Sequence, residues 1–240
     1  MKSIADWALN TATQRGAGYA DVRIVDDRQR SLATKNAKVG HASNSESFGL
    51  GVRVLVNNAW GFAATDDLDR HSVDQAAAKA VEIAQASARV MEHPVRLAAE
   101  PPAKIDWATP CKIDPFSTSV AENLDLLIKI DSELLSVPGV TLAESNLHFG
   151  RYEQWFHSTE GSDIHQTRYS TGAGFAALSF HGTEIQKRSY PNSFGGQYQS
   201  KGYELVGELK LLENARRIGE EAVALHKADQ CPQGNMTVVL

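Results

Sequence analysis

The sequence predicts an α+β protein with antiparallel sheets and flanking helices. Strand-like segments come in runs, helical periodicity is confined to the ends of those runs, and each half has the order helix, strands, helix. A doubly wound parallel sheet would instead alternate single strands with helices. The repeated order suggests two helix–strands–helix subdomains, although the two halves share negligible sequence identity.

The first half is predicted to contain two helices with strands between them. Asn57–Asn58 suits a hairpin turn, because asparagine tolerates positive φ. Ser72 and Gln75 have the spacing of a capping box at the start of the second helix, which Pro94 is expected to end. In chain order the predicted elements are a helix over 3–14, strands over 20–24, 31–34, 48–56 and 60–65, and a helix from 72.

The second half follows a connector that contains five prolines. Ser119 and Glu122 predict another capping box, and Gly150 is interpreted as a turn between strands. The predicted elements are a helix from 120 to Pro138, strand-like segments between 140 and 189, a glycine-rich loop over 193–197 and one long amphipathic helix over 205–225. The predicted division is a first subdomain over 1–93, a connector over 94–116 and a second subdomain over 117–240.

Composition and charge exclude several classes of protein. The 240 residues have an ordinary apolar and charged content, which excludes a disordered chain or a disulfide scaffold. The 24 basic and 29 acidic residues give a net charge of −5, so no direct nucleic-acid partner is expected. Apolar runs are far shorter than the roughly 18 residues of a membrane span, so no membrane partner is expected. An N-terminus without an apolar core and two distant cysteines, Cys111 and Cys231, favour the cytoplasm.

The eight histidines do not have the spacing of metal ligands. Zinc sites usually contain at least one short-spaced pair of ligands, and no such pair occurs here. We therefore predict no metal ligand in this chain and interpret the histidines as polar residues on strands, near turns or at a helix end. Those on the strands are His148, His157, His165 and His181, and the others are His41, His71, His93 and His226.

No combination of residues predicts a complete catalytic site. Ser45 and Ser47 flank Glu46, and Ser158 precedes Glu160, but no histidine is positioned beside either serine. The catalytic residues are therefore predicted as none, and the substrate-binding residues are unknown.

Four further patterns are interpreted as structural. Gly49–Leu50–Gly51 lacks the third glycine of a dinucleotide site and lies within a strand, where glycine more often marks a bulge or a close approach. Gly195–Gly196–Gln197 resembles the hydrolytic loop of peptide-release factors but lacks a basic setting. Asp66–Asp67 could form an acid pair, although capping of the following loop and helix is favoured. Arg216–Arg217 suits a solvated helix face.

The last residues predict a strand over Thr237–Leu240. Two interpretations stay open: a strand that completes the sheet, or one that continues into further protein. In the second case an apolar patch would be exposed, and we expect self-association through contacts near Leu240 or along the strand Phe48–Val56.

Eight segments along the chain form a further pattern: 19–23, 35–39, 45–54, 59–68, 158–166, 219–223, 231–234 and 238–240. In combination and in this order, they resemble the TldD/PmbA family over the whole chain. The resemblance implies cytosolic zinc metallopeptidases, long labelled modulators of DNA gyrase, that act on peptides as homodimers or as TldD–PmbA-type heterodimers. The chain is similar to the N-terminal half, and its Cys231–Pro232 more to the TldD branch.

The resemblance also implies where the metal lies. In the TldD branch a His-Glu-x-x-x-His helix follows the strand that here ends at Leu240, so a missing C-terminal metallopeptidase domain is expected. Zinc is then expected for the full-length protein and not for this chain, which alone is expected to be inactive. The alternatives are a non-catalytic PmbA-type partner subunit and an unrelated α+β binding module.

Overall fold

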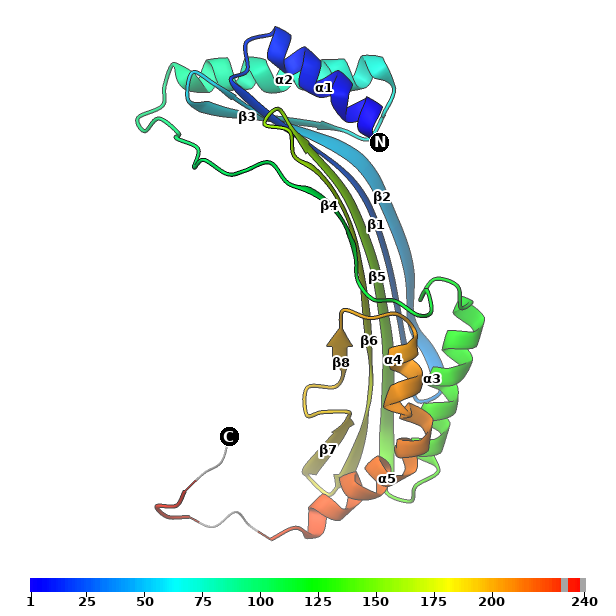
Figure 1. The fold of residues 1–240 in the computed structure, drawn as a ribbon. Coiled ribbons are helices and arrows are strands. Elements are labelled where there is room, and N and C mark those ends of the chain that lie inside the picture. The colour runs from blue at the N-terminus through cyan, green and yellow to red at the C-terminus, as the bar shows by residue number, and fades with distance from the viewer. Residues whose placement is uncertain (230–232, 238–240) are drawn as a thin grey trace.

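The structure is a computed structural model that describes residues 1–229 and 233–237. Figure 1 shows one long, curved sheet with helices at its two ends. The helices are α1 (Lys2–Gln14), α2 (Arg70–Ala88), α3 (Val120–Leu135), α4 (Glu204–Leu209) and α5 (Leu211–Ala224), followed by the 3₁₀ turn η1 (Leu225–Lys227). The strands are β1 (Tyr19–Lys35), β2 (Lys38–Val56), β3 (Ala59–Thr65), β4 (Lys104–Ala108), β5 (Val140–Ser158), β6 (Asp163–His181), β7 (Glu184–Tyr190) and β8 (Gln197–Gln199).

The strands form one eight-stranded sheet in the order β3-β2-β1-β5-β6-β4, with β7 and β8 also paired to β6. All pairs are antiparallel except β4 with β6. The predicted α+β class with antiparallel pairing and flanking helices is confirmed. The division at 93 and 117 stays a prediction. β1 contributes side chains to the packing at both ends of the sheet.

Several strands are longer than predicted. The expected strands over 20–24 and 31–34 form one uninterrupted strand, β1. Gly150 does not form a turn but lies within β5, opposite Gln29 and Ser170. The middle of the sheet lacks helical cover, so its residues are polar and carry no simple alternation of apolar and polar side chains.

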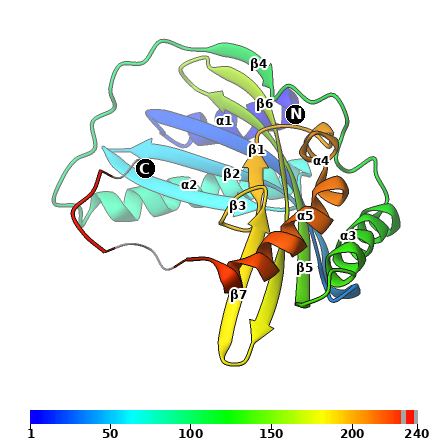
Figure 2. The same ribbon diagram turned by 90° about the horizontal axis from the view of Figure 1, so that it is seen from below.

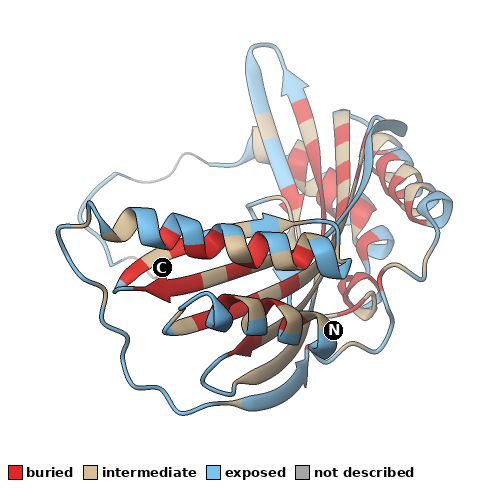
Figure 3. Cartoon of the chain, turned by 90° about the horizontal axis from the view of Figure 1, so that it is seen from above, coloured by how far each residue is buried: buried red, intermediate tan, exposed pale blue. Residues whose placement is uncertain are grey.

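All helices that pack on the sheet lie on one of its two faces. Side chains alternate between the faces of a strand, so residues an even number apart share a face. In β1, Val22 and Ile24 contact the helices at one end, and Leu32 contacts those at the other. Figure 3 shows the buried residues as alternating bands along the strands. The opposite face, called here the helix-free face, has no helix packed against it in the described residues.

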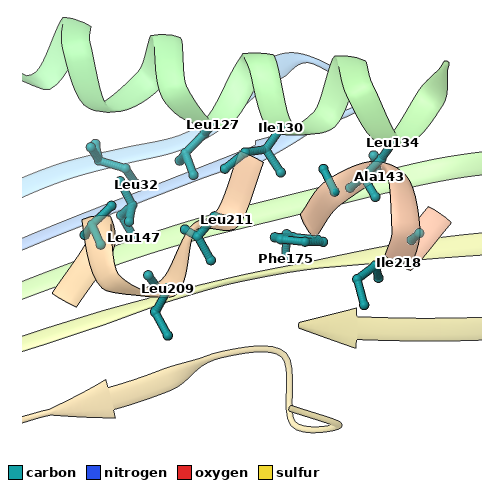
Figure 4. Close-up of a cluster of buried hydrophobic side chains, with 14 of the residues drawn as sticks. Leu32, Leu127, Ile130, Leu134, Ala143, Leu147, Phe175, Leu209, Leu211 and Ile218 are labelled. Atoms are coloured by element: carbon teal, nitrogen blue, oxygen red, sulfur yellow. The ribbon is translucent and has the colours of Figure 1, made fainter. Parts of the chain in front are cut away.

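The helical face has two separate cores. The first core packs α1 and α2 on β1, β2 and β3, and consists largely of alanine and valine. The second core packs α3, α4 and α5 on β1, β5 and β6, and its large side chains include Leu127, Phe149 and Phe175. Figure 4 shows part of this second core.

Three predictions about the helices are wrong: the start of α2, its end, and the unbroken helix over 205–225. The N-cap of α2 is Asp69, whose side chain accepts a hydrogen bond from the Ser72 backbone, and the helix ends at Ala88 rather than at Pro94. The long helix expected over 205–225 is interrupted at Lys210, which has a φ of 49°. The capping box of Ser119 and Glu122 is confirmed.

The connector is extended and contains one short strand. It runs from the end of α2 past β4 to α3 (Figure 1 and Figure 2). The turn at Asn57–Asn58 has positive φ at both residues, as predicted. Thr237 is not in a strand, and the remainder of the predicted terminal strand, 238–240, lies outside the described residues. None of the described helices combines the length and apolar character needed to cross a membrane.

Candidate functional site

An apolar depression lies on the helix-free face where β1, β2 and β3 meet. Its volume is about 580 Å³. Gly49 and Gly51 are two residues apart and therefore lie on the same face of β2. Because glycine has no side chain, the space above this part of the strand is open. A Cβ on Gly51 would lie 2.9 Å from the ring of Phe62, so a larger residue there would displace the ring. Other lining residues are Arg23, Val25, Phe48, Ala64, Thr65 and Asp66.

Phe62 gives the depression an exposed aromatic wall. Its side chain comes from β3 and the residue is 57% exposed. An exposed large apolar residue beside a concave apolar surface is typical of binding sites. The depression can therefore accept an apolar group of a ligand.

A fixed cluster of charges borders the depression. Asp21 is only 1% exposed and accepts a 2.6 Å hydrogen bond from Nη2 of Arg53 and a 3.1 Å bond from Nη1 of Arg23. The Arg53 guanidinium lies 4.6 Å from the centre of the Trp60 ring, and that of Arg23 lies 5.0 Å from the Phe156 ring. Two arginines share one carboxylate, so positive charge and N–H donors remain available beside the apolar surface.

Tyr19 also contacts this charge cluster. Burial raises the pKa of its phenol, and the neighbouring Asp21 carboxylate raises it further. The phenol is therefore a neutral donor at physiological pH. Tyr19 also packs edge-on against Trp60, with ring centres 6.0 Å apart, and so helps to fix the aromatic surface below Arg53.

His165 lies on the helical face, between two carboxylates. Its Nδ1 is 3.1 Å from Asp106 and its Nε2 is 2.9 Å from Glu153. Its ring stacks on Trp155 with centres 5.1 Å apart. These contacts join β4, β5 and β6, which supports a structural role.

The other three strand histidines lie apart from His165. His157 is buried with its Nδ1 3.4 Å from Asp163, His148 lies near the Tyr198 ring, and His181 lies near His226. Gly150 does not form the expected turn, so His148 pairs with Ser31 and Gly172. No three His, Cys, Asp or Glu side chains of the described residues are grouped in a way that could hold a metal ion. A zinc ion therefore does not fit these residues, and no catalytic step through a metal is derived from them.

The remaining candidates from the sequence are dispersed. Ser45, Glu46 and Ser47 lie exposed on β2, and Ser158 ends β5 close to Glu160. The loop of Gly195 and Gly196 packs against Gly174, where a Cβ would lie 2.2 Å from the Gly195 carbonyl oxygen. This close approach explains Gly174 by packing, whereas Gly195 is a glycine in a turn with a φ of 84°.

The charged candidates have structural contacts. Asp67 accepts a hydrogen bond from the Asp69 backbone in the loop before α2, whereas Asp66 lines the depression. Arg216 and Arg217 form ion pairs on the surface of α5, as predicted for a solvated helix face. The predicted capping role therefore applies to Asp67 only indirectly, since the N-cap of α2 is Asp69.

Sequence reasoning did not identify the depression. Its signal was the spacing of Gly49 and Gly51, which leaves two successive positions on one strand face without side chains. The exposed Phe62 and the paired arginines come from other strands, and only the β1–β2–β3 register brings them together.

Comparison with known proteins supports one family. Residues 20–84 match the family model for PmbA/TldA metallopeptidase domain 1. A protein named "Metalloprotease" from Methanothermobacter thermautotrophicus is 27% identical over 92% of this chain and 46% of its own length. A metalloprotease from Methanocaldococcus jannaschii is 23% identical over 92% of this chain and 48% of its own. The chain thus spans about half the length of these relatives.

Solved structures have the same fold. A candidate modulator of a DNA gyrase from Thermotoga maritima aligns with a TM-score of 0.74 at 17% identity, covering 97% of this chain and 50% of that one. TldE from Thermococcus kodakarensis aligns with a TM-score of 0.62 at 12% identity, covering 92% of this chain and 46% of that one. The family-model match over 20–84, the metalloprotease relatives and these likenesses of fold all support the TldD/PmbA family.

Proposed function

We propose that this chain is part of a cytoplasmic metallopeptidase that processes peptides. The metalloprotease names of its relatives support the reaction class. In this proposal the chain supplies a substrate-binding surface and a dimer interface. Zinc is the proposed metal, held by residues other than those described, since these residues do not fit it.

One observation carries the substrate-binding role: the depression above Gly49 and Gly51 has an apolar wall and a positive border. A peptide offers apolar side chains and carbonyl or carboxylate oxygens at short, regular spacing. In our proposal one apolar side chain contacts Phe62 while Arg23 donates to a main-chain oxygen. Asp21 holds the guanidinium in place for this contact.

An activity assay with the full-length protein tests this role. Replacing Phe62 by alanine removes an exposed ring and should leave folding nearly unchanged. Loss of roughly 1.5 kcal/mol of apolar contact would raise KM for a peptide with a large apolar side chain about 10-fold at constant kcat. Ile185→Ala on β7 is the matched control, because Ile185 has the same 57% exposure. Equal effects of the two substitutions, or none, would contradict the role of the depression.

The alternative is a non-catalytic partner subunit of the PmbA type. Chelator treatment of the purified full-length protein separates the two functions. A metallopeptidase loses its activity on peptides and regains it with added zinc. A partner subunit has no activity alone and enhances that of a second, catalytic subunit. The net charge of −5 predicts that this chain itself has no salt-dependent DNA affinity.

A further inference from the structure

A second cavity lies where the connector passes the start of β1. Its volume is about 300 Å³, and it is called here the connector pocket. Its sheet residues lie on the helix-free face, because Tyr19 is four residues from Arg23 in β1 and Phe156 pairs with Arg23. The lining residues are Tyr19, Phe156 and Ser158 of the sheet, Leu97, Ala98, Glu100 and Pro101 of the connector, and Glu160 and Ser162 of the loop after β5.

Backbone hydrogen bonds fix both walls of the connector pocket. The Val95 N–H donates to a carbonyl of the β2–β3 turn at 2.9 Å, and the Ala103 carbonyl accepts from the first residue of β6 at 2.8 Å. The connector is therefore tied to the sheet on either side of residues 97–101. In the loop after β5, the Thr159 N–H donates to a carbonyl of β1 at 2.9 Å. Walls that are held in place in advance lower the cost of ordering them when a ligand binds.

The lining combines apolar walls with negative charge. Leu97, Pro101 and the Phe156 ring offer apolar surface. Glu100 and Glu160 are exposed, and neither forms an ion pair with another described residue. No lysine, arginine or histidine is among the residues that line the pocket. Apolar walls with carboxylates at the rim are complementary to a side chain with an apolar stem and a cationic end, as lysine and arginine have.

Arg23 makes the connector pocket a neighbour of the depression. Its side chain lines the depression, and its guanidinium lies 5.0 Å from the centre of the Phe156 ring, which lines the pocket. The buried Asp21 carboxylate accepts a hydrogen bond from Arg23 and so limits the repulsion of a second cation. Gly51, Arg23 and Phe156 are in register on three neighbouring strands. Two strand spacings are about 10 Å, or about three residues of an extended peptide.

From this arrangement we propose that the connector pocket binds the side chain of a lysine or arginine of the peptide substrate. This basic residue lies about three residues from the apolar side chain that contacts Phe62. The inference rests on the proposed function and adds a substrate class to it, namely peptides that carry a basic and a large apolar residue at this spacing. An N-terminal amino group has the same charge but no apolar stem to fill these walls.

Binding of labelled peptides to the purified full-length protein, measured by fluorescence anisotropy, tests this specificity. The peptides are N-acetylated, carry the label at the C-terminus, and have one leucine with lysine or glutamine about three residues before or after it. The better lysine peptide should bind about 5-fold more tightly than its glutamine counterpart, and less so as salt is added, because the difference is electrostatic.

A double substitution locates the cation. Glu100→Gln with Glu160→Gln should abolish most of the preference for lysine. Glu213→Gln with Glu220→Gln on α5 is the control with the same change of charge, since both of these side chains are at least 60% exposed, and it should keep the preference. Circular dichroism confirms that each variant folds.

Three results would overturn the proposal. The first is equal binding of the lysine and glutamine peptides, which would leave the apolar role of the depression intact. The second is a preference for lysine that persists in the Glu100→Gln and Glu160→Gln variant. The third is a glutamine peptide that binds as tightly as the lysine peptide once its N-terminus is left free, which would assign the pocket to an amino group. Failure of the proposed function is a different result, in which none of the peptides binds.

Discussion

The two cores on the helical face differ in the size of their side chains. In the first core, seven of the fifteen buried residues are alanine, and α2 lies so close to β3 that a Cβ on Gly61 would meet the α2 backbone. The second core contains seven leucines and two phenylalanines among its seventeen buried residues, and these fill the larger space below α3, α4 and α5. One core depends on close approach of backbones, and the other on large side chains filling a volume.

This difference predicts opposite sensitivities. Close-packed interiors respond to both added and removed volume. Adding a methyl group should disturb the first core most, since its backbones are already in contact. Removing a large side chain should disturb the second core most, because the cavity left behind cannot be closed by neighbouring strands.

The largest expected effect is that of Phe175→Ala in the second core. Phe175 is fully buried and packs against Tyr190 with ring centres 5.5 Å apart. Its removal leaves a cavity and should lower the free energy of unfolding by about 3–5 kcal/mol. Denaturant titration of the purified protein measures this loss. A change below about 1 kcal/mol would mean that this core can collapse and that the comparison is wrong.

A smaller effect is expected for Gly61→Ala in the first core. A Cβ on Gly61 would lie 2.0 Å from the Ala80 carbonyl oxygen and 2.6 Å from the Ala84 nitrogen, so α2 must move outward. Overpacking of this kind costs about 1–3 kcal/mol. Gly207→Ala is the matched control, because a Cβ there meets no atom within 4 Å. It should be neutral or slightly stabilising, since alanine is the better helix former. If Gly61→Ala and Gly207→Ala had equal effects on stability, the close approach of α2 to β3 would not be the cause.

The same comparison explains which parts of the fold could be predicted from sequence. Strand residues under a helix alternate clearly, as Val52 and Val54 do, and these segments were identified. Between the cores, side chains such as Asp26 and Arg28 meet no helix, so β1 appeared in the sequence as two short strands. At Lys210 the leucine spacing continues across a break, since Leu209 and Leu211 both face the second core.

The candidate site is formed by residues from several strands, so the sequence of one strand could not predict it. Gly49 and Gly51 indicated a close approach, but the Phe62 ring above them is set by the register of β3. Residues 38–48 of β2 extend beyond the end of β3, and their serines and asparagine resemble a polar loop in the sequence. Pairing between distant strands is therefore the step that local patterns could not supply.

The smallest expected effect concerns pH and the first core. His157 lies at the α1 end of the sheet, only 5% exposed, and burial lowers its pKa below the ordinary 6.5, although Asp163 partly opposes this. The other charged groups facing it are Asp6, Lys2 and the N-terminal amine. A lowered pKa in the folded state means that the unfolded chain binds the proton more tightly. The stability from neutral His157 is thus present above pH 6.5 and is lost as pH falls through the lower folded value.

We therefore expect the free energy of unfolding to decline as pH falls below 6.5, and His157→Asn to flatten that decline. Asparagine is also polar but does not titrate, so only the pH-dependent part is removed. His71→Asn, an exposed position on α2, should leave the decline unchanged. Urea titrations between pH 7 and pH 5 measure the three slopes. If His71→Asn flattens the curve as much as His157→Asn does, burial at the α1 end is not its cause. If neither substitution changes the slope, acid sensitivity comes from groups elsewhere in the molecule, and the first core does not contribute to it through His157.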